Sequence, residues 1–257
     1  MIFFPLFATM ELLHLEIQEW WDVMIDIHCH ILPGVDDGAQ TLEMSVAMAR
    51  AFEADGVRTV VATSHFCYVH RVDRAVVHRK LEDVREELDR QGVTLTLLPG
   101  NEVRLESSKF FYEAAEADAF CYLGGDKRFL LVEQPWEGFN PDTHSIIKDL
   151  LAQGTRPILA HPERQLFFRA SFDLLERQLA LGCWTQVNVG SLLGENGPDA
   201  QAFAFDLVDR GLAHTIATDA HNLKRRPNLS LGFQAIEARA GAAAAEAIRA
   251  RMATIAP

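Results

Sequence analysis

Short apolar runs alternate along the chain with longer stretches in which apolar residues recur every three or four positions. The short runs, rich in Val, Ile and Leu, predict buried strands. The longer stretches have the spacing of helices that bury one face. The predicted strands are 24–29, 58–63, 94–98, 129–133, 156–160, 184–189 and 214–218. The predicted helices are 41–54, 73–90, 108–117, 143–153, 171–181, 198–210 and 230–239, followed by a terminal helix in the Ala-rich segment 240–247.

This alternation predicts an α/β fold with a parallel sheet, because a helix between two strands returns the chain to the same edge. About seven such units favour closure into a TIM-like barrel, with an open doubly wound sheet as the alternative. No glycine-rich nucleotide-binding pattern follows a predicted strand. We therefore expect one barrel domain over residues 24–257. Several helices are predicted to end at a left-handed glycine, namely Gly56, Gly92, Gly154, Gly182 and Gly211.

Residues 1–23 differ from the rest of the chain. They are rich in Phe, Leu and Trp and contain no Lys or Arg, so they fit a secretory signal poorly. We interpret them either as the product of a start codon assigned too early, which we favour, or as an apolar extension that packs elsewhere, for example on a partner subunit. No apolar run reaches the roughly 18 residues that a membrane span needs.

The composition and net charge of the chain limit the kinds of molecule that it can bind. The 257 residues are 49% hydrophobic and 23% charged, as in an ordinary globular protein. The net charge of −12 argues against a nucleic-acid surface, which needs clustered Lys and Arg. It does not exclude a phosphate substrate, because bound cations would reverse the charge locally. The four cysteines lack C-x-x-C spacing, so we expect reduced thiols in a cytoplasmic protein.

Two pairs of polar residues follow apolar strands far apart in the sequence. His28 and His30 close the first predicted strand, and Asp219 and His221 follow the last. Side chains two residues apart share one face of a strand, so each pair can offer two metal ligands side by side. In a parallel barrel the carboxyl ends of all strands meet on one face. These pairs therefore predict a metal-dependent hydrolase.

Other predicted strands also lead into metal-binding side chains. They contribute His65, Glu102, Glu133 and His161, and the turn after the first strand adds one Asp at position 36 or 37. Five imidazoles and four carboxylates exceed the roughly four ligands of a single Zn²⁺ site. Mixed nitrogen and oxygen donors in this number suggest two or three ions of the Mn, Fe or Zn kind. Glu133 is our choice for a carboxylate that bridges two ions.

Each of these residues also has a simpler interpretation. A single His or Glu at a strand end is usually an ordinary polar residue, and only the repetition over successive strands favours a site. Asp26 either orients His28 or His30 or fills a polar interior, and both readings stay open. Asp36 could simply cap the following helix. Ordinary surface or core roles are assigned to His14, His70, His78, His144 and His214.

Two arginines follow the predicted ligands closely. Arg164 lies three residues after His161, and Arg226 lies five after His221. Guanidinium groups bind phosphate in bidentate fashion and can neutralise charge that grows in a transition state. A solvated basic loop is the alternative for Arg225 and Arg226, whereas Arg164 sits beside a strand end that carries a ligand.

The candidate ligands lie in six short motifs. They are IDIHCHILPGVDDGA at 25–39, TSH at 63–65, GNE at 100–102, LVE at 131–133, AHPER at 160–164 and DAHN at 219–222. Together they resemble the PHP (polymerase and histidinol phosphatase) superfamily, and within it the bacterial tyrosine-protein phosphatases of the capsule and exopolysaccharide type. The resemblance covers nearly all of 24–233. Family members usually begin at the methionine that corresponds to Met24, and a second His or a basic residue is common after His65, where this chain has Phe66.

This resemblance implies a distorted (βα)7 barrel with a trinuclear centre, most often of manganese. It also implies that Arg164 and Arg226 bind phosphate, and that Asp37 rather than Asp36 is a metal ligand. We count Arg164, Arg226, Asp37 and His221 as catalytic. The implied substrate is the phosphotyrosine tail of a bacterial tyrosine kinase that controls polysaccharide assembly. The implied metal ligands are His28, His30, Asp37, His65, Glu102, Glu133, His161, Asp219 and His221.

The expected reaction is direct hydrolysis of phosphotyrosine by a hydroxide that the metal ions activate. No Cys-x5-Arg loop of the cysteine phosphatases is present, and tyrosine, with a pKa of about 10, is a good leaving group. The closest alternative is hydrolysis of histidinol phosphate or another small phosphomonoester. A phosphodiesterase or nuclease is a further alternative that the acidic chain disfavours. An inactive, metal-stabilised docking module is the alternative from another class.

Overall fold

The computed structural model describes residues 24–256, so the interpretation of residues 1–23 lies outside the described part. The fold is mixed α/β, and all strand pairs in its two sheets are parallel. The first sheet has the order β1-β2-β4, and the second has the order β3-β5-β6-β7-β8-β9. The strands are β1 (Met24–Cys29), β2 (Val57–Ala62), β3 (His65–Phe66), β4 (Thr96–Pro99), β5 (Glu102–Arg104), β6 (Phe129–Glu133), β7 (Arg156–Ala160), β8 (Trp184–Asn188) and β9 (Thr215–Ala217).

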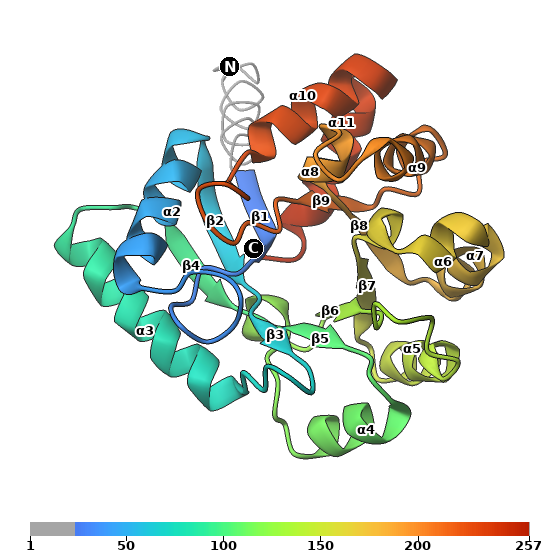
Figure 1. Cartoon of the computed structure of the whole chain (residues 1–257), viewed down its shortest axis with the longest axis horizontal. Helices are drawn as coiled ribbons and strands as arrows, with labels where there is room; N and C mark the ends of the chain where they lie inside the picture. Colours follow the sequence, from blue (N-terminus) through green and yellow to red (C-terminus); the bar gives the residue numbers. More distant parts are fainter. Residues whose placement is uncertain (1–23, 257) are drawn as a thin grey trace, which may run out of the picture.

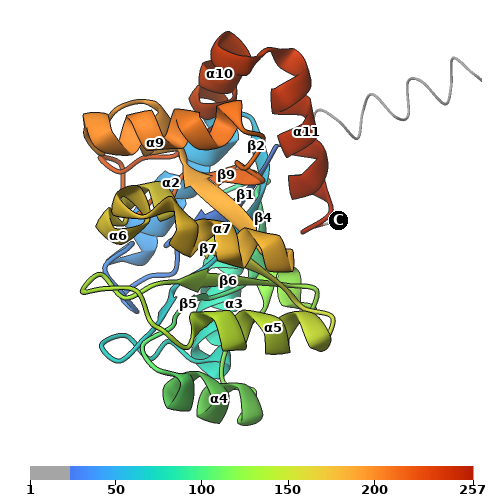
Figure 2. The ribbon, with the colours of Figure 1, turned by 90° about the vertical axis from the view of Figure 1, so that its right-hand side faces the viewer.

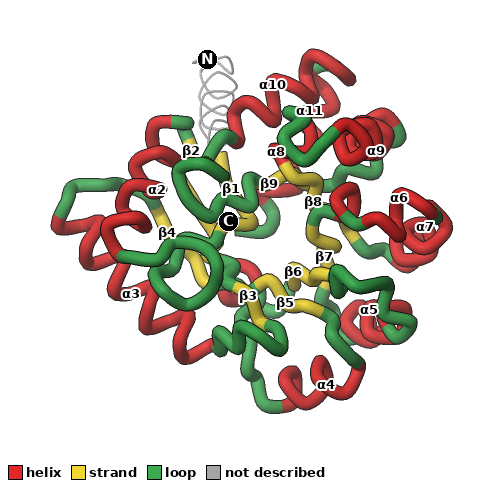
Figure 3. The backbone as a smooth tube through the Cα atoms, in the orientation of Figure 1, coloured by secondary structure: helices red, strands yellow, loops and turns green. Residues whose placement is uncertain are grey.

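The two sheets share two chain segments. β2 continues after two residues into β3, and β4 continues after two residues into β5, so each segment leaves one sheet and enters the other. On the other side, β9 lies beside β1: the His30 N–H donates to the Ala220 carbonyl at 2.9 Å, and the Asp219 N–H donates to the His28 carbonyl at 2.9 Å. The strands therefore surround a common centre, and the helices lie outside them (Figures 1 and 3).

Most predicted helices are present, with ends shifted by one or two residues. Several begin with a side chain that accepts a backbone N–H, as Thr41, Asp73 and Ser107 do. Gly241, at φ 86°, separates the last two helices, and α11 extends beyond the predicted Ala-rich segment. The helices are α2 (Leu42–Ala54), α3 (Arg74–Arg90), α4 (Ser108–Glu116), α5 (Thr143–Ala152), α7 (Phe172–Leu181), α9 (Pro198–Asp209), α10 (Leu229–Ala240) and α11 (Ala242–Ala253).

Some short elements were not predicted. The strands β3 and β5 and the helices α6 (Leu166–Ala170) and α8 (Val189–Leu192) are too short to show a hydrophobic period. The same holds for the 3₁₀ turns Leu123–Gly125 and Pro162–Arg164. All five glycines predicted to end helices have positive φ, which confirms that part of the pattern.

The core has two parts. The larger part lies between the strands and the helices that surround them, and the smaller part lies among the strands. Ile27, Val61, Leu131 and Ile158 belong to the inner part, together with Ile255 that follows α11. Figure 2 shows α10 and α4 at opposite ends of the molecule. Within residues 24–256, no helix combines the length and the apolar character needed to cross a bilayer.

Candidate metal centre

The strand ends bring all nine predicted metal ligands together. His, Asp and Glu side chains form four overlapping groups, and within each group the possible ligand atoms lie within 4.8 Å of one another. Four residues, His28, His30, His65 and Glu102, each belong to two groups, and of these the carboxylate of Glu102 could bind two neighbouring ions at once. The groups are His30 with Asp37, His65 and His221; His28 with Glu102 and His161; His28 with His30 and Asp219; and His65 with Glu102 and Glu133.

The donor set fits divalent cations. Oε2 of Glu102 is buried and has no hydrogen-bond donor among the described residues. The imidazole nitrogens of His28, His30 and His65 nevertheless lie 3.4, 3.6 and 2.8 Å from it. A buried carboxylate oxygen without a donor is costly, and cations among these side chains would remove that cost. The mixture of imidazole and carboxylate donors suits Mn, Fe or Zn ions.

Hydrogen bonds to Nδ1 orient the two histidines at the end of β1, His28 in the strand and His30 directly after it. The Gln186 side-chain oxygen lies 2.8 Å from Nδ1 of His28, and Asp36 Oδ2 lies 3.0 Å from Nδ1 of His30. Each acceptor holds a proton on Nδ1 and so leaves the lone pair on Nε2. The two Nε2 atoms face each other at 3.2 Å. Both imidazoles therefore present a lone pair toward the same point.

The two aspartates of the first turn have different roles. Asp36 is buried and does not cap α2, whose cap is Thr41; its carboxylate instead accepts from the backbone N–H groups of Gly38 and His65. Asp37 is half exposed, and its Oδ1 lies 3.4 Å from the imidazoles of both His65 and His221. The structure therefore places Asp37 at the centre, while Asp36 fixes the turn.

Asp26 does not touch the imidazole of His28 or His30. It accepts hydrogen bonds from the hydroxyl and the backbone N–H of Thr218 and from the backbone N–H of His28. Burial raises the pKa of Asp26 to about 6, although these hydrogen bonds oppose the shift. Of the two interpretations left open by the sequence, the structure supports a polar interior residue, one that connects β1 to the end of β9.

His161 and Asp219 adopt left-handed backbone conformations, with φ of 32° and 52°. Such values are uncommon for residues other than glycine and cost on the order of 1–3 kcal/mol each. Both residues come directly after or close to a strand end, His161 after β7 and Asp219 after β9. At each residue, the sharp turn of the backbone directs the side chain into the centre. The strained backbone conformations therefore occur at candidate ligands.

Burial and the charges of neighbouring groups determine which of the candidate ligands are protonated. Burial lowers the pKa of His161 to about 4, so its imidazole is neutral and able to act as a ligand. Burial, and then the neighbouring charge of Glu102, raise the pKa of Glu133 to about 7, although Arg104 opposes the shift. The two carboxylates therefore repel each other across a space that cations would fill favourably.

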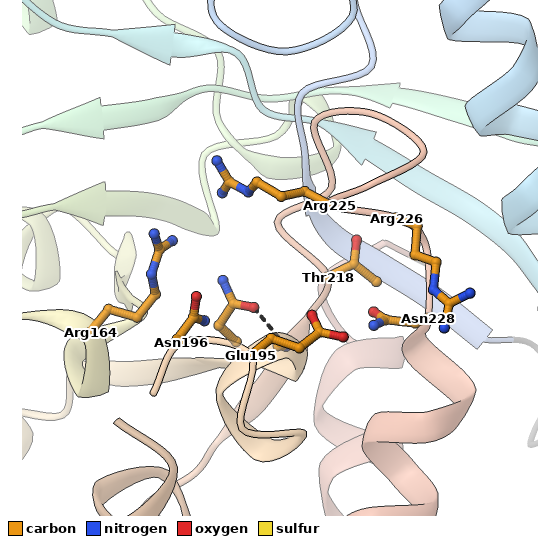
Figure 4. Close-up of a pocket in the computed structure, with 9 residues that line it drawn as sticks. Arg164, Glu195, Asn196, Thr218, Arg225, Arg226 and Asn228 are labelled. Atoms are coloured by element: carbon orange, nitrogen blue, oxygen red, sulfur yellow. Dashed lines mark hydrogen bonds between the residues drawn. The ribbon is translucent and has the colours of Figure 1, made fainter. Parts of the chain in front are cut away.

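Of the two predicted arginines, Arg164 contacts a candidate metal ligand, whereas Arg226 lies at an adjoining pocket. Arg164 Nη1 lies 2.6 Å from Asp219 Oδ2, which places Arg164 at the centre. Arg225 Nη2 lies 2.7 Å from the same oxygen, whereas Arg226 lines an adjoining small pocket with Thr218 and Asn228. Figure 4 shows the guanidinium group of Arg226 pointing away from those of Arg164 and Arg225. Arg225 was missed because two adjacent arginines in a loop give no sign of which one turns inward.

Arg104 and Trp136 also border the centre and were not predicted. Arg104 Nε donates to Glu133 Oε2 at 2.6 Å. The indole of Trp136 stacks on His161, with ring centroids 5.6 Å apart, and lies under the guanidinium of Arg164 at 5.2 Å. Both residues line a cavity of about 220 Å³ above the candidate ligands. Arg104 is the last residue of β5 and Trp136 lies three residues after β6, so their positions offer a signal only once the strand ends are known.

Comparison with known proteins identifies the family. A family model described as "Capsular polysaccharide synthesis, CpsB/CapC" matches residues 24–255. The chain belongs to the CpsB/CapC family. It is 36% identical over 204 residues to the tyrosine-protein phosphatase YwqE of Bacillus subtilis, covering 79% of each chain. It is 30% identical over 205 residues to the putative tyrosine-protein phosphatase CapC of Staphylococcus aureus, again covering 79% of each.

Solved structures agree with this assignment. A crystal structure from work on YwqE of Bacillus subtilis and CpsB of Streptococcus pneumoniae, described as metal-dependent tyrosine phosphatases, matches with a TM-score of 0.86 and 31% identity. The match covers 91% of this chain and 94% of the other. A phosphotriesterase homology protein from Escherichia coli matches with a TM-score of 0.51 and 13% identity, which shows a related fold only.

A substitution in the turn after β1 of this CpsB/CapC family member tests whether that turn positions the candidate metal ligands. A Cβ at Gly38 would lie 2.2 Å from the His30 carbonyl oxygen, so Gly38→Ala must displace the turn that carries Asp36 and Asp37. Because Asp36 orients His30, we expect metal affinity to fall about 10- to 100-fold. Metal titration of the stripped variant measures this. Gly138→Ala is the matched control, since no atom lies within 4 Å of its Cβ position; equal affinities in both variants would contradict the role of the turn.

Proposed function

We propose that the protein is a metal-dependent protein-tyrosine phosphatase of capsule or exopolysaccharide synthesis. One observation carries the proposal: in a chain of the CpsB/CapC family, nine imidazole and carboxylate side chains converge beneath a cavity that three arginines line. Its relatives YwqE and CpsB are named tyrosine-protein phosphatases. The acceptor of the phosphoryl group is water, because every cysteine is buried and none lines this cavity.

The proposed ligands of two or three divalent ions are the nine residues of the four groups. Manganese is our first choice, with iron or zinc as alternatives, because the set is rich in both imidazole and carboxylate. Bound there, the cations supply positive charge that attracts phosphate and lowers the pKa of water toward neutrality. Glu133 keeps its proposed place as a bridging carboxylate, and Asp37 and His221 are proposed to act in catalysis beside their role as ligands.

The arginines of the chain orient the phosphate in this proposal. Arg164 and Arg225 both lie at the cavity, where their guanidinium groups can contact equatorial phosphate oxygens. Arg226 is kept as a further proposed phosphate ligand. In support, it lines the adjoining pocket together with Arg164 and has no ion-pair partner among residues 24–256. Its side chain must rotate to reach the phosphate.

The proposal also covers the domain organisation and the fold of the chain. We describe residues 24–257 as one domain, a distorted (βα)7 barrel in which β2 with β3 and β4 with β5 each count as one strand. The contacts between β9 and β1 and the family match over 24–255 support this.

We propose a phosphotyrosine tail of a bacterial tyrosine kinase as the partner. A cytoplasmic location is part of the proposal, supported by four buried cysteines without a disulfide.

Substrate choice tests the proposal. Phosphate release is measured side by side from a phosphotyrosine peptide, the same peptide with phosphoserine, and histidinol phosphate, using protein loaded with each metal in turn. We expect clear preference for the phosphotyrosine peptide, because phenolate leaves more readily than alkoxide. Preference for histidinol phosphate would move the protein to small-molecule metabolism, and hydrolysis of none of the three would refute the proposal.

Loss of Arg164 should weaken substrate binding without loss of metal. In Arg164→Ala, the partner Asp219 still has Arg225 at 2.7 Å and the Asn188 amide at 2.9 Å, so it stays in place. We expect kcat/KM for the phosphotyrosine peptide to fall about 100-fold, as when one charged transition-state contact is removed. Arg58→Ala, an exposed arginine in β2, is the control. A drop in metal content equal to the drop in activity would show a structural role instead.

A further inference from the structure

The cavity above the candidate ligands is polar on nearly every side. Its other lining residues are acidic, basic or imidazole side chains, and Trp136 is the one apolar residue that lines it in the described part of the chain. Phosphate can be bound by the charged groups, but the aromatic ring of a phosphotyrosine needs an apolar surface. Only the indole offers one inside this cavity.

The indole is held in place and still partly open. One face stacks on His161, with an interplanar angle of 17°, and Arg164 packs on the ring. Despite these contacts, Trp136 remains 44% exposed. Part of the indole surface therefore stays accessible beside Arg164, the candidate phosphate ligand. A substrate whose phosphate group contacts Arg164 would place its aromatic ring against this surface.

The loop that carries Trp136 is fixed by side-chain hydrogen bonds at both ends. The Gln134 side chain donates to Thr143 Oγ1 at 2.9 Å and accepts from the Asn140 N–H at 3.0 Å. The Asn140 side chain donates to the Leu105 carbonyl at 2.8 Å. Because the loop is ordered before any ligand arrives, a stacking contact there loses little conformational entropy on binding.

We propose that Trp136 determines specificity for aryl phosphates by stacking against the phenyl ring of phosphotyrosine. This inference rests on the proposed phosphatase function and adds the residue that distinguishes an aryl from an alkyl phosphate. Aromatic rings favour offset-stacked or edge-to-face contact, which strengthens binding beyond the area that is buried. An alkyl phosphate has no ring and gains nothing from the indole.

Two phosphonates that the enzyme cannot hydrolyse test the proposal by calorimetry on the metal-loaded protein. Phenylphosphonate carries the ring, and methylphosphonate carries only the anionic group. We expect wild-type protein to bind phenylphosphonate about tenfold more tightly. In Trp136→Ala this preference should disappear while methylphosphonate affinity and metal content stay unchanged. Trp136→Phe should retain most of the preference, and Tyr112→Ala, which removes an exposed aromatic residue outside the cavity, should retain all of it.

Three results would overturn the inference. One is equal loss of affinity for both phosphonates in Trp136→Ala, which would mean that Trp136 acts by holding Arg164 or His161. The others are an unchanged preference in Trp136→Ala and a wild-type protein that shows no preference or no phosphonate binding. Turnover of the phosphotyrosine peptide by the same wild-type preparation separates these results from failure of the phosphatase proposal itself.

Discussion

Replacing His161 or Asp219 by alanine should abolish turnover while leaving a folded protein. Both side chains belong to the candidate ligand groups, and both are directed there by left-handed backbone. Loss of one ligand empties or misplaces an ion, so we expect hydrolysis of the phosphotyrosine peptide to fall at least about 10³-fold. Removing Asp219 also leaves Arg164 and Arg225 without their shared carboxylate, and the phosphate site then loses its geometry as well.

The measurement combines phosphate release, metal content and circular dichroism of each purified variant. His144→Ala is the matched control, because His144 is an exposed histidine of α5 outside the ligand groups. Near-normal activity in His161→Ala or Asp219→Ala would contradict the assigned centre. A variant that is unfolded by circular dichroism would be replaced by His161→Gln or Asp219→Asn, which keep the size of the side chain.

Glu102→Gln should have an effect of similar size, although it changes only one charge. Glu102 is fully buried, belongs to two ligand groups, and has its other oxygen, Oε1, 3.0 Å from Nε2 of His161. Its pKa is held well below the usual range: burial would raise it, but the neighbouring imidazoles, chiefly those of His28 and His65, outweigh burial. An amide cannot supply this negative charge, so we expect loss of at least one bound ion per chain and about 10³-fold lower activity.

Glu106→Gln is the control for this variant. Glu106 lies outside the ligand groups and accepts a hydrogen bond from the exposed Tyr68 N–H. Metal content is measured by inductively coupled plasma mass spectrometry after removal of free ions. If Glu102→Gln kept the wild-type number of ions, the proposal that Glu102 contributes to two metal positions would be wrong.

The sequence could predict the candidate ligands because their position depends on a simple rule. Parallel strands end on one side, so a His, Asp or Glu after each strand converges with the others whatever the details of packing. His28 and His161 are separated by more than half of the described chain, yet they lie in one ligand group. The longer helices were also predictable, since they show their apolar period and most have a capping residue or a terminal glycine, whereas α6 and α8 are too short to show one.

The sequence could not show the directions in which individual side chains point. The adjacent residues Arg225 and Arg226 look equivalent until the turn closes, where the His221 N–H donates to the Arg225 carbonyl at 3.0 Å. Asp36 and Asp37 are likewise adjacent, and their residue type alone did not separate them; the family resemblance favoured Asp37, whose Oδ1 lies 3.4 Å from the imidazoles of His65 and His221. Trp136 lies in a loop without periodicity, so its place at the cavity follows from contacts far away in the sequence.

The most direct test of the central claim is phosphate release from a phosphotyrosine peptide by chelator-stripped protein, before and after addition of Mn²⁺, Fe²⁺, Zn²⁺ or Mg²⁺. The account predicts no activity in the stripped protein and recovery with at least one of these ions, with Mn²⁺ the most effective. Full activity after verified removal of metal would contradict it.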